Sequence, residues 1–174
     1  GVQTCALPIL ATMMQLFGED GGFDFMKGLH SNINQYTKSG SAPIKAAGRG
    51  ETTIGIVFMH DAVKQAVKGF PVKVVAPAEG TGYEIGSMSI IDGARNMKEA
   101  KAFYDWALSA DAQNLALEVN AFQVPSNTGA KTSASAPDMS TIKLIDYDFK
   151  TYGSSATRKR LLKKWDDEVS VLAQ

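Results

Sequence analysis

Three side chains have the types and spacing to hold a small polar molecule: His60 and Asp61, adjacent in the chain, and Glu84 further along. An imidazole beside a carboxylate supplies both hydrogen-bond donors and acceptors, as sugar hydroxyls require, and a second carboxylate accepts two further hydroxyls. The His60-Asp61 pair is also compatible with a metal site, with catalysis, or with Asp61 as the N-cap of a helix. Glu84 is also compatible with a solvated hinge residue. The sequence alone leaves these alternatives open.

A second candidate site is the segment Thr37-Lys38-Ser39-Gly40, which precedes a predicted helix. Two hydroxyls, a lysine and the free N–H groups of a helix start together form a plausible anion site. An ordinary N-cap turn has the same residue types, and the sequence does not separate the two. Arg49-Gly50-Glu51 is predicted to shape a turn and not to contact a ligand.

The elements that must position these residues alternate between strand and helix, which indicates an α/β fold with a parallel sheet. Strands are expected at Asn32–Tyr36, Thr52–Phe58 and Val72–Ala76. Polar clusters follow the second and third of these strands. Because ligands in open α/β sheets lie beyond the carboxyl ends of strands, these clusters predict one cleft.

The remaining elements follow from apolar periodicity and from turn residues. Helices are expected at Leu10–Phe17, Gly22–His30, Ser41–Gly48, Asp61–Lys68, Met97–Leu108, Asp111–Val119 and Thr157–Leu172. A further strand is expected at Ser87–Ile91, a surface loop at Ser126–Ser140, and a short strand or turn within Ile142–Phe149.

The first nine residues, GVQTCALPI, resemble one translated reading frame of a short-read sequencing adapter. They have neither helical nor strand period, and they lack the basic start and long apolar middle of a signal peptide. We therefore expect residues 1–9 to be foreign and the natural chain to be truncated at its N-terminus. Cys5, the only cysteine, then says nothing about the redox compartment.

Composition excludes several classes of function. The 18 basic and 18 acidic residues balance, which argues against a nucleic-acid or polybasic membrane surface. No apolar run reaches the roughly 20 residues that span a bilayer. The chain has no nucleophile elbow, P-loop or zinc spacing, so we expect neither catalysis nor a resident metal or cofactor.

From Leu10 onward the chain resembles the second half of a periplasmic solute-binding protein of an ABC importer. The branch is the one usually labelled iron(III)-type, which also contains binders of organic ligands and hexose phosphates. The motifs that carry the resemblance are YTKSG at 36–40, RGETTIGI at 49–56, HDAV at 60–63, GFPV at 69–72, EGTGYEIGS at 79–87, YDWA at 104–107, AQ at 112–113 and VPSN at 124–127.

The resemblance implies a type II periplasmic binding fold with two lobes that close on ligand. Residues 10–78 would belong to the second lobe, and residues 79–128 to a hinge crossing and the returning part of the first lobe. Residues 129–174 would form a loop and a C-terminal helix packed on the second lobe. It also implies a periplasmic monomer that delivers its ligand to an inner-membrane permease.

One departure from the iron-binding members bears on the ligand. Near the end of the Thr52–Phe58 strand, where such members carry adjacent tyrosines, this chain has Met59 and His60. With Glu84, the His60-Asp61 pair is more similar to the sugar-phosphate branch. We therefore expect a phosphorylated sugar or similar small polyol anion. A ferric or other metal complex is the alternative ligand, and an α/β enzyme with His60 as general base is the alternative class.

Overall fold

The computed structural model describes residues 2–4 and 6–172. In chain order the elements are β1 (Val2–Thr4), α1 (Ala6–His30), β2 (Ile33–Tyr36), α2 (Ala42–Gly48), β3 (Ile54–Ile56), α3 (Met59–Val67), α4 (Met97–Ala107), α5 (Ala110–Glu118), the 3-10 turn η1 (Met139–Thr141), α6 (Phe149–Tyr152) and α7 (Ser155–Glu168). The chain divides into unit 1, residues 1–84 and 138–174, and unit 2, residues 85–137. Among the described residues, no helix is both long and apolar enough to cross a membrane.

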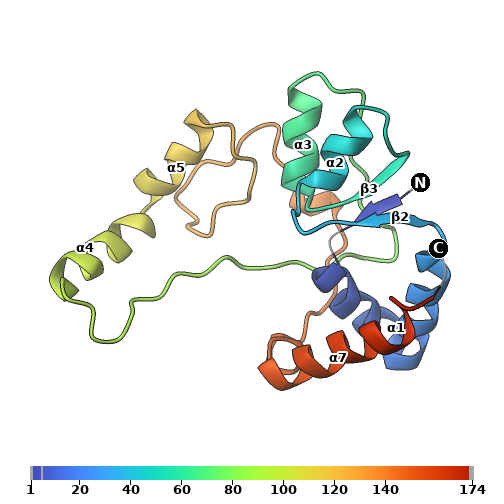
Figure 1. Cartoon of the computed structure of the whole chain (residues 1–174). Helices are drawn as coiled ribbons and strands as arrows, with labels where there is room; N and C mark the ends of the chain where they lie inside the picture. Colours follow the sequence, from blue (N-terminus) through green and yellow to red (C-terminus); the bar gives the residue numbers. More distant parts are fainter. Residues whose placement is uncertain (1, 5, 173–174) are drawn as a thin grey trace. The chain divides into compact units, whose positions relative to one another are not determined.

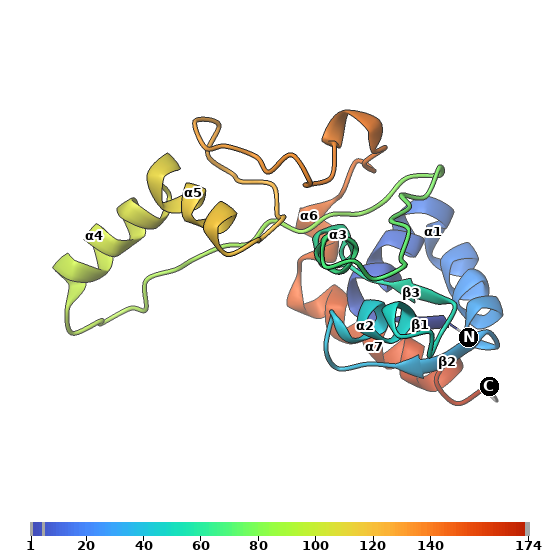
Figure 2. The same cartoon turned by 90° about the horizontal axis from the view of Figure 1, so that it is seen from above.

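Unit 1 is built on a three-stranded parallel sheet with the order β2-β1-β3. In the central strand, Thr4 lies opposite Tyr36 of β2 and Ile56 of β3. Helices α2 and α3 cover one face of this sheet, and α1 and α7 lie on the other (Figures 1 and 2). The carboxyl ends of all three strands therefore meet at one edge, with helices leaving toward opposite faces.

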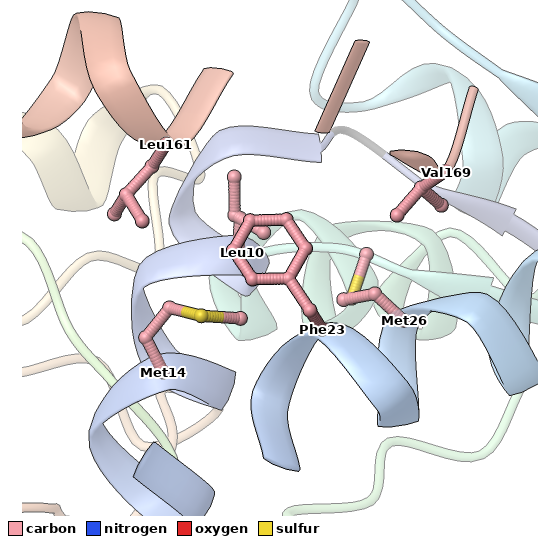
Figure 3. Packing of buried hydrophobic residues seen from close by; sticks show 6 residues of the cluster. All are labelled: Leu10, Met14, Phe23, Met26, Leu161 and Val169. Carbon is pink, nitrogen blue, oxygen red and sulfur yellow. The ribbon is translucent and has the colours of Figure 1, made fainter. Parts of the chain in front are cut away.

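The core of unit 1 lies between α1 and α7. Figure 3 shows the six buried side chains of this cluster: Leu10, Met14, Phe23 and Met26 from α1, and Leu161 and Val169 from the C-terminal segment. Within α1, Gly18 has φ 72° and ψ 170°, a conformation that breaks the helix and that glycine adopts without steric cost. The break lets the two halves of α1 pack against each other across Met14 and Phe23. It confirms the predicted pair of helices.

Unit 2 contains α4 and α5, which contact each other, and long irregular segments on either side. Within residues 85–137, all of which the structure describes, Phe122 is the one buried residue, at 4% exposure. The predicted bounds of α4 and α5 agree with the structure to within one residue at each end.

Two predicted strands are absent from the described chain. Val72–Ala76 alternates between half-buried and exposed residues, as a strand does, but pairs with no neighbour, and Ser87–Ile91 is extended and mostly exposed. Alternation alone does not make a strand, because a ladder requires a second backbone to accept its hydrogen bonds. The parallel sheet expected from three successive strands therefore contains β2 and β3 but not Val72–Ala76.

Residues 1–9 have neither helical nor strand period in the sequence, but those that the structure describes belong to regular elements. Val2–Thr4 forms the central strand β1, and α1 begins at Ala6 and continues through the Ile9–Leu10 junction. A strand of three residues is too short to show alternation in the sequence, and its two partners lie some thirty and fifty residues away. Cys5 lies outside the described residues.

Candidate functional site

His60 and Asp61 lie in the first turn of α3, directly after the carboxyl end of β3. The His60 ring stacks on Phe58 with a centroid distance of 5.6 Å and an interplanar angle of 15°. His60 Nε2 lies 3.9 Å from Asp61 Oδ2, and the two side chains are 30% and 25% exposed. The pair therefore presents a donor and two acceptors at a position that solvent or a ligand can reach.

Asp61 is not the N-cap of α3, which was one of the alternatives that the sequence left open. The helix begins two residues earlier, at Met59, and its N-cap is Phe58 in extended conformation, with no side-chain hydrogen bond to the helix. The Asp61 backbone N–H instead donates to Phe58 O at 3.1 Å. The helix dipole stabilises a carboxylate in the first turn even when that carboxylate makes no capping hydrogen bond. Its oxygens remain available to a ligand.

The second candidate segment, Thr37-Lys38-Ser39-Gly40, follows the carboxyl end of β2 and precedes α2. Thr37 Oγ1 donates to Ser39 O at 2.8 Å, so this hydroxyl already stabilises the turn. Ser41, the N-cap of α2, makes no side-chain hydrogen bond to the helix. The local geometry is therefore that of a turn, with the Lys38 ammonium as the charged group available to an anion.

A surface hollow of about 460 Å³ extends from this turn along α2. Two segments provide its polar lining. One is residues 35–39, which form the end of β2 and the turn that follows it, and the other is Arg49 with Glu51, just after α2. Arg49 Nε and Nη2 donate to the Glu51 carboxylate at 2.5 and 2.8 Å. This bond lowers the pKa of Glu51 and holds both charges in the turn. The sequence predicted that turn but not its place beside Thr37–Ser39.

The parallel sheet brings His60-Asp61 and Thr37–Gly40 to the same edge. Because β1 lies between β2 and β3, the carboxyl ends of β2 and β3, which the two clusters follow, are two strand spacings apart, about 10 Å. The helix after β1 lies on one face and the helices after β2 and β3 lie on the other, so the chain switches faces at this edge, which is where open α/β sheets bind their ligands. The arrangement suits a ligand with a polyol at one end and an anion at the other.

Glu84 is the last residue of unit 1 and is exposed. The segment that leads to it is held by Thr81, whose N–H donates to Lys143 O at 2.9 Å and whose carbonyl accepts from Ile145 N–H at 3.1 Å. Glu84 lies near Tyr147: burial, and then the Glu84 charge, raise the pKa of the Tyr147 hydroxyl.

In the part of the chain that the structure describes, no three His, Cys, Asp or Glu side chains are grouped to hold a metal ion. The structure therefore does not bring His60, Asp61 and Glu84 together as a metal-binding set. It places the first two as a contact pair at β3 and the third in the crossing segment.

Sequence reasoning missed the aromatic surroundings of Glu84. The Tyr83 ring lies 6.0 Å from Tyr147 and 5.3 Å from Phe149, edge-on to both. Tyr147 and Phe149 are some sixty residues from Glu84 in the chain, and no local periodicity links them. The one available signal was the aromatic spacing within Ile142–Phe149, which indicated only a strand or turn.

The chain matches the family model described as bacterial extracellular solute-binding protein over residues 2–151. It is 48% identical over 167 residues to an uncharacterized protein of Haemophilus influenzae, covering 95% of this chain and 48% of the relative. It is 23% identical over 145 residues to an Fe(3+)-binding periplasmic protein of Serratia marcescens, covering 79% and 42% of the two chains. The chain thus spans about half the length of the curated relatives it matches.

Among solved structures, the periplasmic binding protein AfuA from Actinobacillus pleuropneumoniae, with exogenous fructose-6-phosphate bound, superposes with a TM-score of 0.93. It is 48% identical, and the match covers 98% of this chain and 56% of AfuA. The periplasmic binding protein P5PA superposes with a TM-score of 0.90 at 38% identity, covering 97% and 56%.

Proposed function

Since the chain belongs to the family of bacterial extracellular solute-binding proteins, we propose that it captures a phosphorylated sugar, or a similar small polyol anion, for an ABC importer. The family binds its solutes and does not transform them. The resemblance stated from the sequence, the periplasmic location and the non-enzymatic class are thereby confirmed. His60 as the general base of an enzyme is accordingly set aside.

The observation that carries the proposal is the His60-Asp61 pair. Both side chains are partly exposed at the carboxyl end of β3, and the Asp61 carboxylate is not used as a helix cap. Sugar hydroxyls both donate and accept, and an imidazole beside a carboxylate matches them. The likeness to AfuA, whose structure holds fructose-6-phosphate, supports the same ligand class for this chain.

In this proposal Glu84 accepts further hydroxyls, and the turn at Thr37, Lys38, Ser39 and Gly40 contributes positive charge and N–H groups toward the anionic end. Lys38 supplies the charge, and the distance between the two strand ends accommodates a hexose phosphate. The other half of the relatives' length supplies the opposite side of the cleft. The partner is an inner-membrane permease, and the protein works as a monomer without nucleic acid.

The test uses the full-length protein, meaning this sequence together with the remaining half found in its relatives. Titration calorimetry with glucose 6-phosphate and fructose 6-phosphate should show binding that Asp61→Ala weakens by about 1–3 kcal/mol, the cost of leaving a polar partner unpaired. Asp24→Ala, which removes an exposed carboxylate from α1, is the matched control and should bind as the wild type does. Wild-type affinity in Asp61→Ala, His60→Ala and Glu84→Ala alike would contradict the proposed site.

A ferric ligand is the second candidate, favoured by the Fe(3+)-binding relative from Serratia marcescens. Ferric iron prefers hard phenolate and carboxylate oxygens, whereas this chain has Met59 and His60 where the resemblance to iron-binding members implies adjacent tyrosines. We therefore expect full-length protein incubated with ferric citrate to stay colourless and to gain no thermal stability. A strong visible band that disappears in Tyr83→Phe would favour iron instead.

A further inference from the structure

The crossing segment that ends at Glu84 does not stand alone. It is joined to the segment at residues 143–149 by a ladder of a single parallel pair, in which Thr81 pairs with Leu144. Two backbone hydrogen bonds close this ladder, from Thr81 N–H to Lys143 O and from Ile145 N–H to Thr81 O. The position of the backbone near Glu84 thus depends on residues that return to unit 1 from unit 2.

Beyond the ladder, three rings join the same two segments. Tyr83, Tyr147 and Phe149 form a closed triangle with centroid distances of 6.0, 5.3 and 4.7 Å, which we call the aromatic cluster. Two of the three pairs are edge-on, an arrangement that aromatic rings favour. Tyr83 directly precedes Glu84 in the chain, so the aromatic cluster fixes the position of the residue to which Glu84 is bonded.

The aromatic cluster is in turn fastened to α1. The Asp148 backbone N–H donates to Gln15 Oε1 at 2.7 Å. Gly82 packs so closely on α1 that a Cβ there would lie 2.1 Å from Thr12 Oγ1, so the segment can approach the helix only as glycine. The cluster therefore links the crossing segment to the core helix of unit 1.

Glu84 needs such support because its own side chain has no ionic partner in the part of the chain that the structure describes. Among the described residues, no Lys, Arg or His forms an ion pair with its carboxylate. An exposed, unpaired side chain loses conformational entropy when it binds a ligand, and this loss weakens binding. The loss is smaller when the backbone of the residue is already held in place.

We propose that the aromatic cluster holds the Glu84 carboxylate in position for ligand binding, which makes Tyr147 and Phe149 positioning residues. The inference rests on the proposed function and adds two residues to its site. The ring packing carries the effect, so a phenylalanine at position 147 substitutes for the tyrosine. The raised pKa of Tyr147 agrees with this geometry, because burial and the Glu84 charge are its two largest causes.

The experiment is a double-mutant cycle in the full-length protein, with Kd for fructose 6-phosphate and glucose 6-phosphate measured by titration calorimetry. Tyr147→Leu and Phe149→Leu should each raise Kd by roughly 3- to 10-fold, within the range of coupling between residues in contact. In a Glu84→Gln background the same changes should add less than about 2-fold, because the group they position is gone. In a His60→Ala background they should retain their full effect, and Tyr147→Phe should keep the wild-type Kd.

The outcomes separate the two ideas. If wild-type protein binds neither sugar phosphate, the proposed function fails. If it binds, and the leucine variants leave Kd unchanged or act fully in the Glu84→Gln background, the positioning role alone is overturned. Phe149 is 42% exposed, so Phe149→Leu gives a cycle that remains decisive if Tyr147→Leu does not fold.

Discussion

Unit 1 and unit 2 bury their apolar side chains very differently. In unit 1, α1 and α7 enclose Phe23 and Met26, which are 1% and 0% exposed. In unit 2, the helices α4 and α5 leave Phe103 61%, Trp106 49% and Leu115 45% exposed. Both units contain amphipathic helices, but the apolar face is covered only in unit 1.

The difference shows that helix formation and core formation are separate requirements. The period of α4 and α5 predicts their bounds to within a residue, although nothing in the described chain covers them. An amphipathic helix gains most of its stability from packing its apolar face. We therefore expect a further segment to cover the apolar faces of α4 and α5. The relatives are about twice as long as this chain, and we propose that their other half provides that segment.

The largest predicted effect lies in the core of unit 1. Phe23→Ala should destabilise unit 1 by about 3–5 kcal/mol, because the cavity it leaves is enclosed by α1 and α7. Trp165 packs against this core, and Trp106, the other tryptophan, lies in unit 2. Urea unfolding of a Trp106→Phe chain, followed by Trp165 fluorescence, therefore reports on unit 1 alone. A loss below about 1 kcal/mol would mean that this core does not hold unit 1 together.

Sequence reasoning succeeded where the determinants are local. Two separate helices, Leu10–Phe17 and Gly22–His30, were predicted where α1 breaks at Gly18, and the bounds of α4 and α5 were predicted to within one residue. It failed where partners are distant. The strand at Val2–Thr4 pairs with β2 and β3, and the predicted strand at Val72–Ala76 finds no partner in this chain.

The candidate site divides in the same way. The rule for alternating strands and helices predicted polar clusters after Thr52–Phe58 and after Val72–Ala76. The first cluster does follow the strand β3, whereas the second follows a segment that forms no strand. The aromatic cluster could not, because Tyr83 and Tyr147 are brought together by a ladder between segments on either side of unit 2. The foreign origin of GVQTCALPI stays a prediction, which resequencing across the Ile9–Leu10 junction would decide.

A smaller effect is expected at the ion pair that joins the two core helices. Arg160 donates to both Glu19 oxygens at 2.6 and 2.8 Å, and these bonds lower the pKa of Glu19 against a smaller opposing effect of burial. Since the pair is at the surface, Glu19→Gln should cost only about 0.2–1 kcal/mol at pH 7.

The pH dependence of this cost has a defined sign. A carboxylate with a lowered folded-state pKa stabilises the protein above the unfolded value of 4.5, and the contribution is lost as the pH falls through the folded-state value. Thermal melts of wild type and Glu19→Gln should therefore differ at pH 7 and converge as the pH falls below 4.5 and through the lowered folded-state pKa of Glu19. Glu51→Gln is the matched control, because its bidentate partner Arg49 lies two residues away and joins no separate elements. If the difference in melting temperature between wild type and Glu19→Gln were the same at pH 3 as at pH 7, the difference would arise from packing and not from the charge of Glu19.

The smallest effect tests the comparison itself. Phe103→Ala removes an aromatic side chain of the same size as Phe23, but from an uncovered helix face beside Trp106. In the 174-residue chain it should change stability by no more than about 0.5 kcal/mol, because little surface leaves or enters water. In the full-length protein, where we propose that the other half covers α4, the same change should cost about 2–4 kcal/mol. Trp106 emission during urea unfolding reports both values. A small cost in both proteins would show that the exposed face of α4 has no covering partner, and the contrast between the two units would then be intrinsic to them.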